Sequence, residues 1–151
     1  MATRPTRAVN LTKQMLAVAA VVRGARGRVQ GGQLDCVLRL QPTPASCVYT
    51  VQLAYRHGTR PKITVIDPPL QVHPGATSLP HVYTGDLLCL SYPGEWHEDI
   101  LLARTVVPWI SEWLIYYELW LATGEWLGGG AHAGRRRPTG PRRPGPGEQA
   151  A

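Results

Sequence analysis

The chain has 151 residues, and 44% of them are hydrophobic, which fits one domain with a substantial core and leaves little room for a second. Its net charge of +6 would suit a nucleic-acid-binding surface, but residues 133–151 hold five arginines and one glutamate, so only +2 belongs to the rest of the chain. No apolar stretch is long enough to cross a bilayer, so a membrane partner is not expected.

The three cysteines, Cys36, Cys47 and Cys89, are an odd number at wide spacing and form no Cys-x-x-Cys pair. Neither a disulfide framework nor a zinc site is predicted, and we expect no metal and no cofactor. The apolar run over residues 15–22 follows basic residues as in a signal peptide, but it is short and ends at Arg23. We therefore expect a cytoplasmic protein, because a functional thiol stays reduced there.

The N-terminal part of the chain predicts one amphipathic helix. Residues 1–9 are polar and are expected to be flexible. Asn10 or Thr12 can cap a helix over residues 11–23, because apolar residues recur there at helical spacing. These residues are Leu11, Met15, Val18 and Val22. Four glycines in residues 24–32 then predict a flexible, basic connection.

Three strand-like runs follow, at residues 34–40, 46–56 and 62–66. In the second run one set of alternating positions is apolar, namely Cys47, Tyr49, Val51, Leu53 and Tyr55. Side chains at alternate positions of a strand share one face. The pattern predicts an antiparallel β-meander with one covered face. Residues 67–80 contain four prolines, so an irregular loop is expected next.

A long aromatic helix is predicted beyond Trp96. Glu98 and Asp99 carry the charge that is favoured at a helix N-terminus. Apolar residues then recur every three or four positions, at Leu102, Val106, Trp109, Trp113, Tyr116 and Trp120. Pro108 interrupts this stripe, so we expect a kink or a restart with Thr105 as the cap. The stripe is interpreted mainly as core, and self-association into a homo-oligomer is the alternative use of its aromatic side chains.

The C-terminal residues 133–151 are dominated by Pro, Gly and Arg, and they predict a disordered tail. Its arginines could contact phosphates without choosing a sequence, but no aromatic residue is present for base stacking. A solubilising tail is the preferred interpretation, and nucleic acid is not expected as a partner.

Residues 79–90 and the Trp96 that follows carry a resemblance to a known family. They resemble the active-site segment of the ubiquitin-conjugating (UBC-fold) enzymes, His-Pro-Asn-(Val/Ile)-Tyr-x-x-Gly-x-(Val/Ile)-Cys-Leu followed by Trp. The positions that match directly are Pro80, Val82, Tyr83, Cys89 and Leu90, and Gly85 is displaced by one. Leu79 and His81 depart from the family's His and Asn. Residues 100–132 contain Pro108-Trp109, Ser111-Glu112-Trp113, Tyr117-Glu118, Trp120-Leu121-Ala122-Thr123-Gly124 and Gly128-Gly129-Gly130. With these motifs they resemble more narrowly the stand-alone bacterial UBC-like proteins that occur with cGAS-like nucleotidyltransferases in CBASS antiphage defence.

The resemblance implies an α+β, UBC-like fold: an N-terminal helix, an antiparallel β-meander, an active-site loop and C-terminal helices. The implied domain covers residues 10–132, between the flexible residues 1–9 and the tail at residues 133–151. This order agrees with the order of the elements that the local patterns predict.

The resemblance also implies a reaction. Cys89 would carry the C-terminus of a ubiquitin-like or related carrier protein as a thioester and transfer it to a lysine of a partner, with a cGAS-like nucleotidyltransferase as one candidate. Thiolates attack thioesters well and also leave well. A separate activating enzyme is implied, and the chain shows no Gly-rich phosphate loop of its own. His81 would be an oxyanion donor or a base, and Pro80, Tyr83, Gly85 and Trp96 would support the loop.

Two other interpretations stay open. Cys89 lies between Leu88 and Leu90 and could be a small buried hydrophobe, as free cysteines often are. The altered triplet at residues 79–81 also fits a catalytically silent UBC-fold adaptor, and His81 could tie the loop only through a backbone hydrogen bond.

Overall fold

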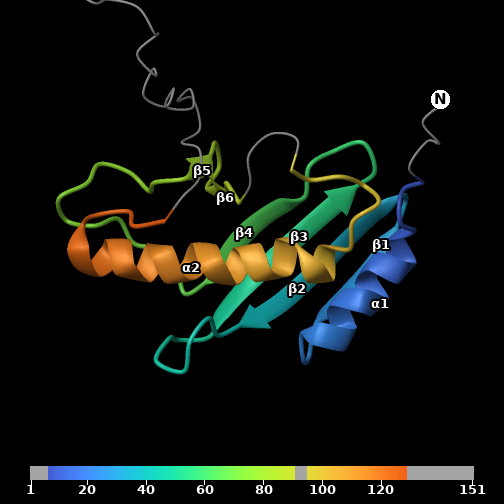
Figure 1. Cartoon of the computed structure of the whole chain (residues 1–151), viewed down its shortest axis with the longest axis horizontal. Helices are drawn as coiled ribbons and strands as arrows, with labels where there is room; N and C mark the ends of the chain where they lie inside the picture. The colour runs from blue at the N-terminus through green and yellow to red at the C-terminus, as the bar shows by residue number, and fades with distance from the viewer. Residues whose placement is uncertain (1–6, 91–94, 129–151) are drawn as a thin grey trace, which may run out of the picture.

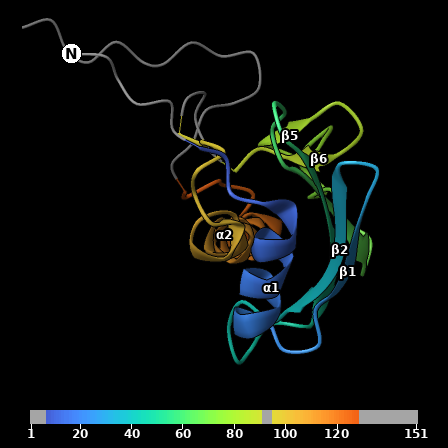
Figure 2. The ribbon, with the colours of Figure 1, turned by 90° about the vertical axis from the view of Figure 1, so that its right-hand side faces the viewer.

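The computed structural model describes residues 7–90 and 95–128 and shows an α+β fold (Figure 1). A four-stranded antiparallel sheet has the order β1-β2-β3-β4, and both α-helices lie on one of its faces (Figure 2). The elements in chain order are α1 (Leu11–Val21), β1 (Arg26–Gln30), β2 (Gln33–Leu40), β3 (Tyr49–Arg56), β4 (Lys62–Asp67), β5 (Val82–Tyr83), β6 (Leu87–Leu88), the 3-10 helix η1 (Leu102–Arg104) and α2 (Val106–Thr123). Neither α-helix of this described part is long and apolar enough to cross a membrane. The predicted tail and residues 1–6 lie outside the described residues.

Helix α1 begins and packs as its sequence predicts. The Asn10 side chain accepts hydrogen bonds from the backbone N–H groups of Thr12 and Lys13, at 2.9 and 3.3 Å, which satisfies two donors of the first turn. Leu11 and Val18 are buried against the sheet. The face also contains a polar residue that the apolar pattern did not mark. Gln14 is fully buried, and its amide joins α1 to the segment before η1.

The meander is confirmed in β2, β3 and β4, where Tyr49, Val51, Leu53 and Tyr55 of β3 alternate into the core. The placement of Cys47 on this face was wrong: β3 begins only at Tyr49, so Cys47 is exposed in the preceding connection.

The flexible connection predicted at residues 24–32 is also wrong, because β1 occupies most of it. Gly31 and Gly32 have φ of 58° and 72° and form the tight turn of a β1-β2 hairpin. All five residues of β1 are exposed, so no alternation of apolar side chains marks the strand in the sequence.

The C-terminal half departs from the prediction at its start. Glu98 and Asp99 do not begin a helix. Glu98 instead ties two loops together, since its carboxylate accepts from the Gly58 N–H at 2.7 Å and its carbonyl accepts from the Val9 N–H at 2.8 Å. Helix α2 begins after Thr105, as the restart predicts, and Pro108 lies in its first turn, where an intrahelical donor is not needed. The Thr105 side chain does not cap the helix, because its hydroxyl donates to the carbonyl oxygen of Leu101 at 2.9 Å.

Helix α2 ends at Thr123, with Gly124 in the left-handed conformation at φ 78°. Several C-terminal helices were expected. Within residues 95–128 the structure has one α-helix, α2, and one 3-10 turn, η1. Helix α2 buries Trp113, Tyr117 and Trp120 against the sheet and the loop, so the aromatic stripe is mostly core.

Candidate functional site

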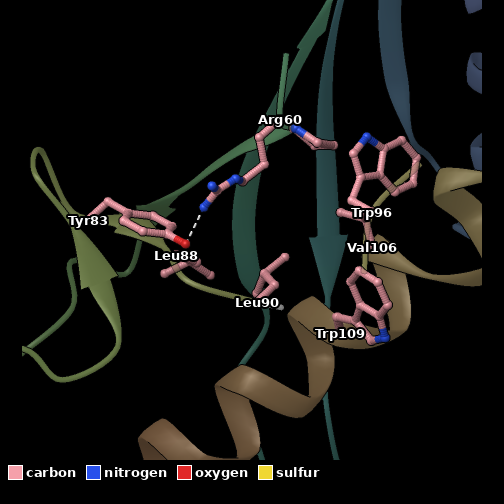
Figure 3. Close-up of a pocket in the computed structure, with 8 residues that line it drawn as sticks. Arg60, Tyr83, Leu88, Leu90, Trp96, Val106 and Trp109 are labelled. Atoms are coloured by element: carbon pink, nitrogen blue, oxygen red, sulfur yellow. Dashed lines mark hydrogen bonds between the residues drawn. The ribbon is translucent and has the colours of Figure 1, made fainter. Parts of the chain in front are cut away.

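Three parts of the chain meet around a small pocket: the β3-β4 turn, the β5-β6 hairpin with the residues after it, and the first turns of α2 (Figure 3). Its walls are mostly apolar, and a phenol and a guanidinium add polar groups at one side. The lining residues are Arg60, Pro61, Tyr83, Leu88, Leu90, Trp96, Val106 and Trp109. The pocket therefore joins segments that lie more than 40 residues apart in the sequence.

Cys89 follows β6 directly and lies beside this pocket, because its neighbours Leu88 and Leu90 both line it. The residue is 8% exposed. Its backbone N–H donates to the carbonyl oxygen of His81 at 2.9 Å, and its Sγ lies 3.3 Å from the hydroxyl oxygen of Tyr83. The thiol thus has a fixed backbone and a polar neighbour.

His81 holds the Cys89 segment through its backbone. Its carbonyl oxygen accepts from Cys89 and also from Nε1 of Trp113 on α2, at 3.1 Å. The residue has a φ of 50°, a conformation in which His is more common than most residues. Its ring is buried and stacks on Trp126, with centroids 4.5 Å apart and planes 26° apart. His81 therefore links the cysteine segment to α2 and to the chain beyond it.

Tyr83 receives a second polar contact from the sheet. An Nη1–H of Arg60 donates to the Tyr83 hydroxyl oxygen, and the guanidinium carbon lies 4.9 Å from the centre of the tyrosine ring (Figure 3). Burial raises the pKa of the Tyr83 hydroxyl, the neighbouring Cys89 raises it further, and Arg60 acts in the opposite direction. With its pKa raised, the phenol keeps its proton at neutral pH and is available as a hydrogen-bond donor.

The remaining predicted residues occupy different places around this pocket. Trp96 lines it and packs edge-to-face on the buried Tyr55, with centroids 5.6 Å apart. Pro80 is half-buried in the loop before β5. Gly85 lies at the exposed tip of the β5-β6 hairpin with a φ of 81°, where its role is to form the turn. The structure thus gathers Cys89, Tyr83 and Trp96 near the pocket and leaves Gly85 at the turn.

Sequence reasoning missed Arg60 and Trp126, and it interpreted Trp113 as a core or self-association residue without linking it to the Cys89 segment. Arg60 is an exposed residue of a Gly-Thr-Arg-Pro turn, a context typical of a solvated loop, so no local signal pointed to it. Among residues 7–90 and 95–128, no three His, Cys, Asp or Glu side chains gather as metal ligands would. The polar side chains that the structure brings together here are the Cys89 thiol, the Tyr83 phenol and the Arg60 guanidinium.

The sequence model of one protein family, E2-CBASS, described as "Type II CBASS E2 protein", matches residues 14–133. The match extends from inside α1 to beyond α2 and includes every residue of the site described above. No curated protein matches the chain.

Proposed function

The chain belongs to the type II CBASS E2 protein family, the E2-like proteins of CBASS antiphage defence, and on this premise we propose that it is a conjugating enzyme that uses Cys89. In this proposal Cys89 carries the C-terminus of a ubiquitin-like or related protein as a thioester. The protein then transfers that C-terminus to a lysine of a partner, for which a cGAS-like nucleotidyltransferase is the candidate. An activating enzyme supplies the charged C-terminus.

The observation that carries the proposal is the placement of the Cys89 thiol. Its backbone is anchored to α2 through His81 and Trp113, and its sulfur lies 3.3 Å from a phenol beside a pocket. A core cysteine needs no such polar neighbour. The order of α1, the antiparallel meander, the cysteine segment and α2 also supports a UBC-like fold.

The reaction has two steps. The Cys89 thiolate attacks the carbonyl carbon of the activated C-terminus, a new C–S bond forms, and the thiolate of the activating enzyme leaves. The amine of the acceptor lysine then attacks the new thioester, the amide bond forms, the amine loses its proton to a base and the Cys89 thiolate leaves. Both steps pass through an oxyanion that needs a hydrogen-bond donor.

His81 belongs to this site in the proposal, with two separable roles. Its backbone carbonyl supports the Cys89 segment, and an imidazole N–H acting as the oxyanion donor stays a prediction. His81→Asn and His81→Gly separate them, because both residues tolerate φ above zero and keep the backbone carbonyl in place, whereas only Asn offers a side-chain N–H. If the oxyanion donor role holds, the discharge of a preformed thioester to lysine is retained in His81→Asn and lost in His81→Gly.

Intact mass spectrometry tests the proposed function. The protein is incubated with the activating enzyme, the carrier protein and ATP, and we expect a carrier-sized adduct that a thiol reductant removes. Cys89→Ser should give a reductant-resistant ester or no adduct. Cys47→Ser is the matched control: Cys47 is exposed and precedes β3, away from the pocket, so its variant should charge like the wild type.

A catalytically silent adaptor is the second candidate, and the 8% exposure of Cys89 favours it. It predicts a folded protein that binds its partners and forms no adduct although the activating enzyme is charged. A reductant-labile adduct that persists in Cys89→Ser would contradict both candidates, because the enzyme would then use another cysteine and the adaptor should form no adduct.

A further inference from the structure

The Arg60 side chain lies in an unusual place for an exposed arginine on a turn. Its guanidinium does not extend into solvent alone but lies near the Tyr83 ring and donates to the Tyr83 hydroxyl (Figure 3). A cation near an aromatic face and a charge-assisted hydrogen bond each stabilise such a contact. The sheet and the β5-β6 hairpin are therefore linked at the residue that contacts Cys89.

The donors and acceptors of the two side chains determine which of them donates in this contact. A guanidinium has donors and no acceptor, whereas a phenol has one donor and can accept. Arg60 therefore occupies the acceptor side of the Tyr83 oxygen and cannot take the hydroxyl hydrogen. That hydrogen is available to the sulfur 3.3 Å away once the thiol has lost its own proton.

We propose that Arg60 is a positioning residue that acts through Tyr83 to stabilise the thiolate of Cys89. When the thiol proton leaves to solvent, the Tyr83 O–H turns to donate to the sulfur, and the Arg60 N–H stabilises the negative charge that builds up on the phenol oxygen. No electron transfer and no co-reactant are involved. The inference rests on the proposed function in one respect, because it takes Cys89 as the nucleophile.

The electrostatic environment of Tyr83 supports its role as a hydrogen-bond donor to the Cys89 thiolate. Burial raises the pKa of Tyr83, so the phenol remains a donor at the pH at which a thiolate forms. Hydrogen bonds to charged groups are stronger than those between neutral groups, so the contact should favour the thiolate over the thiol. Burial by itself disfavours a thiolate, and it raises the pKa of the buried Cys36 thiol to about 11.

The test measures the titration of Cys89 directly, without any carrier protein. Iodoacetamide is added to full-length protein in a Cys47→Ser background, and the rate of Cys89 alkylation is followed by mass spectrometry from pH 6 to 10. The measured quantity is the midpoint of the curve of alkylation rate against pH. We expect Tyr83→Phe to raise this midpoint by about one pH unit and Arg60→Gln to raise it by roughly half a unit. Arg60→Lys keeps the cation and a donor and should restore part of the shift.

The midpoint is a better readout than the rate at a single pH. A tenfold loss of thiolate is partly offset because a more basic thiolate is a better nucleophile, so the rate at pH 7 should fall only about threefold. Arg39→Gln is the matched control, because it removes the same charge from an exposed residue of β2. Arg39 pairs with Thr50, and Thr50 is separated along β3 from Arg56, at the end of β3 that leads to Arg60, by six residues or roughly 20 Å. Its midpoint should equal that of the parent protein.

Each outcome decides the inference. Unchanged midpoints in Tyr83→Phe and Arg60→Gln would overturn it, and so would an equal shift in Arg39→Gln, which would indicate net charge alone. Labelling of the buried Cys36 reports unfolding, so a variant that protects Cys36 is still folded. If the variants shift the midpoint but the protein forms no thioester adduct, the role of Arg60 and Tyr83 is supported and the conjugating function is refuted. If the adduct forms normally but the variants do not shift the midpoint, the conjugating function is supported and the role of Arg60 and Tyr83 is refuted.

Discussion

Gln14→Glu tests whether one buried amide joins the two halves of the fold. Gln14 is fully buried on α1. Its Nε2 donates to the carbonyl oxygen of Ile100 at 2.8 Å, and its Oε1 accepts from the N–H of Leu102 at 2.9 Å. A protonated glutamic acid can make both bonds, but an ionised carboxylate has no donor and faces the Ile100 carbonyl. The variant should therefore be close to wild type only while the new carboxyl is protonated.

The sign and size of the effect follow from the burial. Desolvation and the Ile100 carbonyl both raise the folded-state pKa of the new carboxyl above its unfolded value of about 4.3. A raised pKa means that stability is retained below about pH 4.3 and lost as pH rises toward the folded value. The loss relative to wild type should grow by about 1.4 kcal/mol per pH unit, and a shift of about three units gives about 4 kcal/mol at the plateau.

Urea unfolding followed by tryptophan fluorescence, from pH 4.5 to 8.5, measures this difference. Leu16→Glu is the matched control, because Leu16 is an exposed residue of the same helix and its carboxylate should add no slope. Gln14→Leu should lose about 2–4 kcal/mol at every pH, because it leaves two backbone groups without partners. A constant gap between Gln14→Glu and wild type would refute the reasoning, since it would mean that water reaches the carboxylate.

Three further predictions concern the site and its supports. Trp113→Phe removes the donor to His81 and part of a buried ring, and it should lower the free energy of unfolding by about 2–3 kcal/mol in urea titrations; an unchanged midpoint would contradict the role of this hydrogen bond. Gly124→Ala forces a side chain to φ 78° and against His73, so it should cost about 1–2 kcal/mol, which an unaltered melting temperature would disprove. Cys36, whose pKa burial raises to about 11, should resist Ellman's reagent in native protein at pH 8 and react in denaturant, whereas equal native rates for Cys36 and the exposed Cys47 would contradict the burial.

The parts of the fold that could be predicted are those in which burial imposes a period. Strand β3 and helix α2 bury one face each, so their apolar residues repeat every two or every three to four positions. Strand β1 has no buried residue and is held by its pairing with β2 and its contact with α1, so its residues carry no period. Glu98 was misread for a related reason: its charge suits a helix N-terminus, but a distant backbone N–H binds it instead.

The candidate site was predictable only along one segment of the chain. The resemblance marked residues 79–90 because those residues are contiguous. Arg60 and Trp126 reach the same site through tertiary contacts, 23 residues from Tyr83 and 45 from His81 respectively, and no spacing rule connects such pairs. Gln14 was hidden for a third reason, because a polar residue in an apolar stripe is identified as buried only once its partners are known.

The position of the Cys89 backbone and the environment of its sulfur depend on different elements. The backbone is held by His81, which α2 binds through Trp113, whereas the sulfur meets Tyr83, which the β3-β4 turn binds through Arg60. Loss of the first set of contacts should move the whole segment, and loss of the second should alter only how readily the thiol ionises. Because the two sets of contacts are separate, a substitution at Arg60 should alter the ionisation of the Cys89 thiol without disturbing the fold. The titration of the thiol, and not the stability of the protein, is therefore the property that tests the function of Arg60.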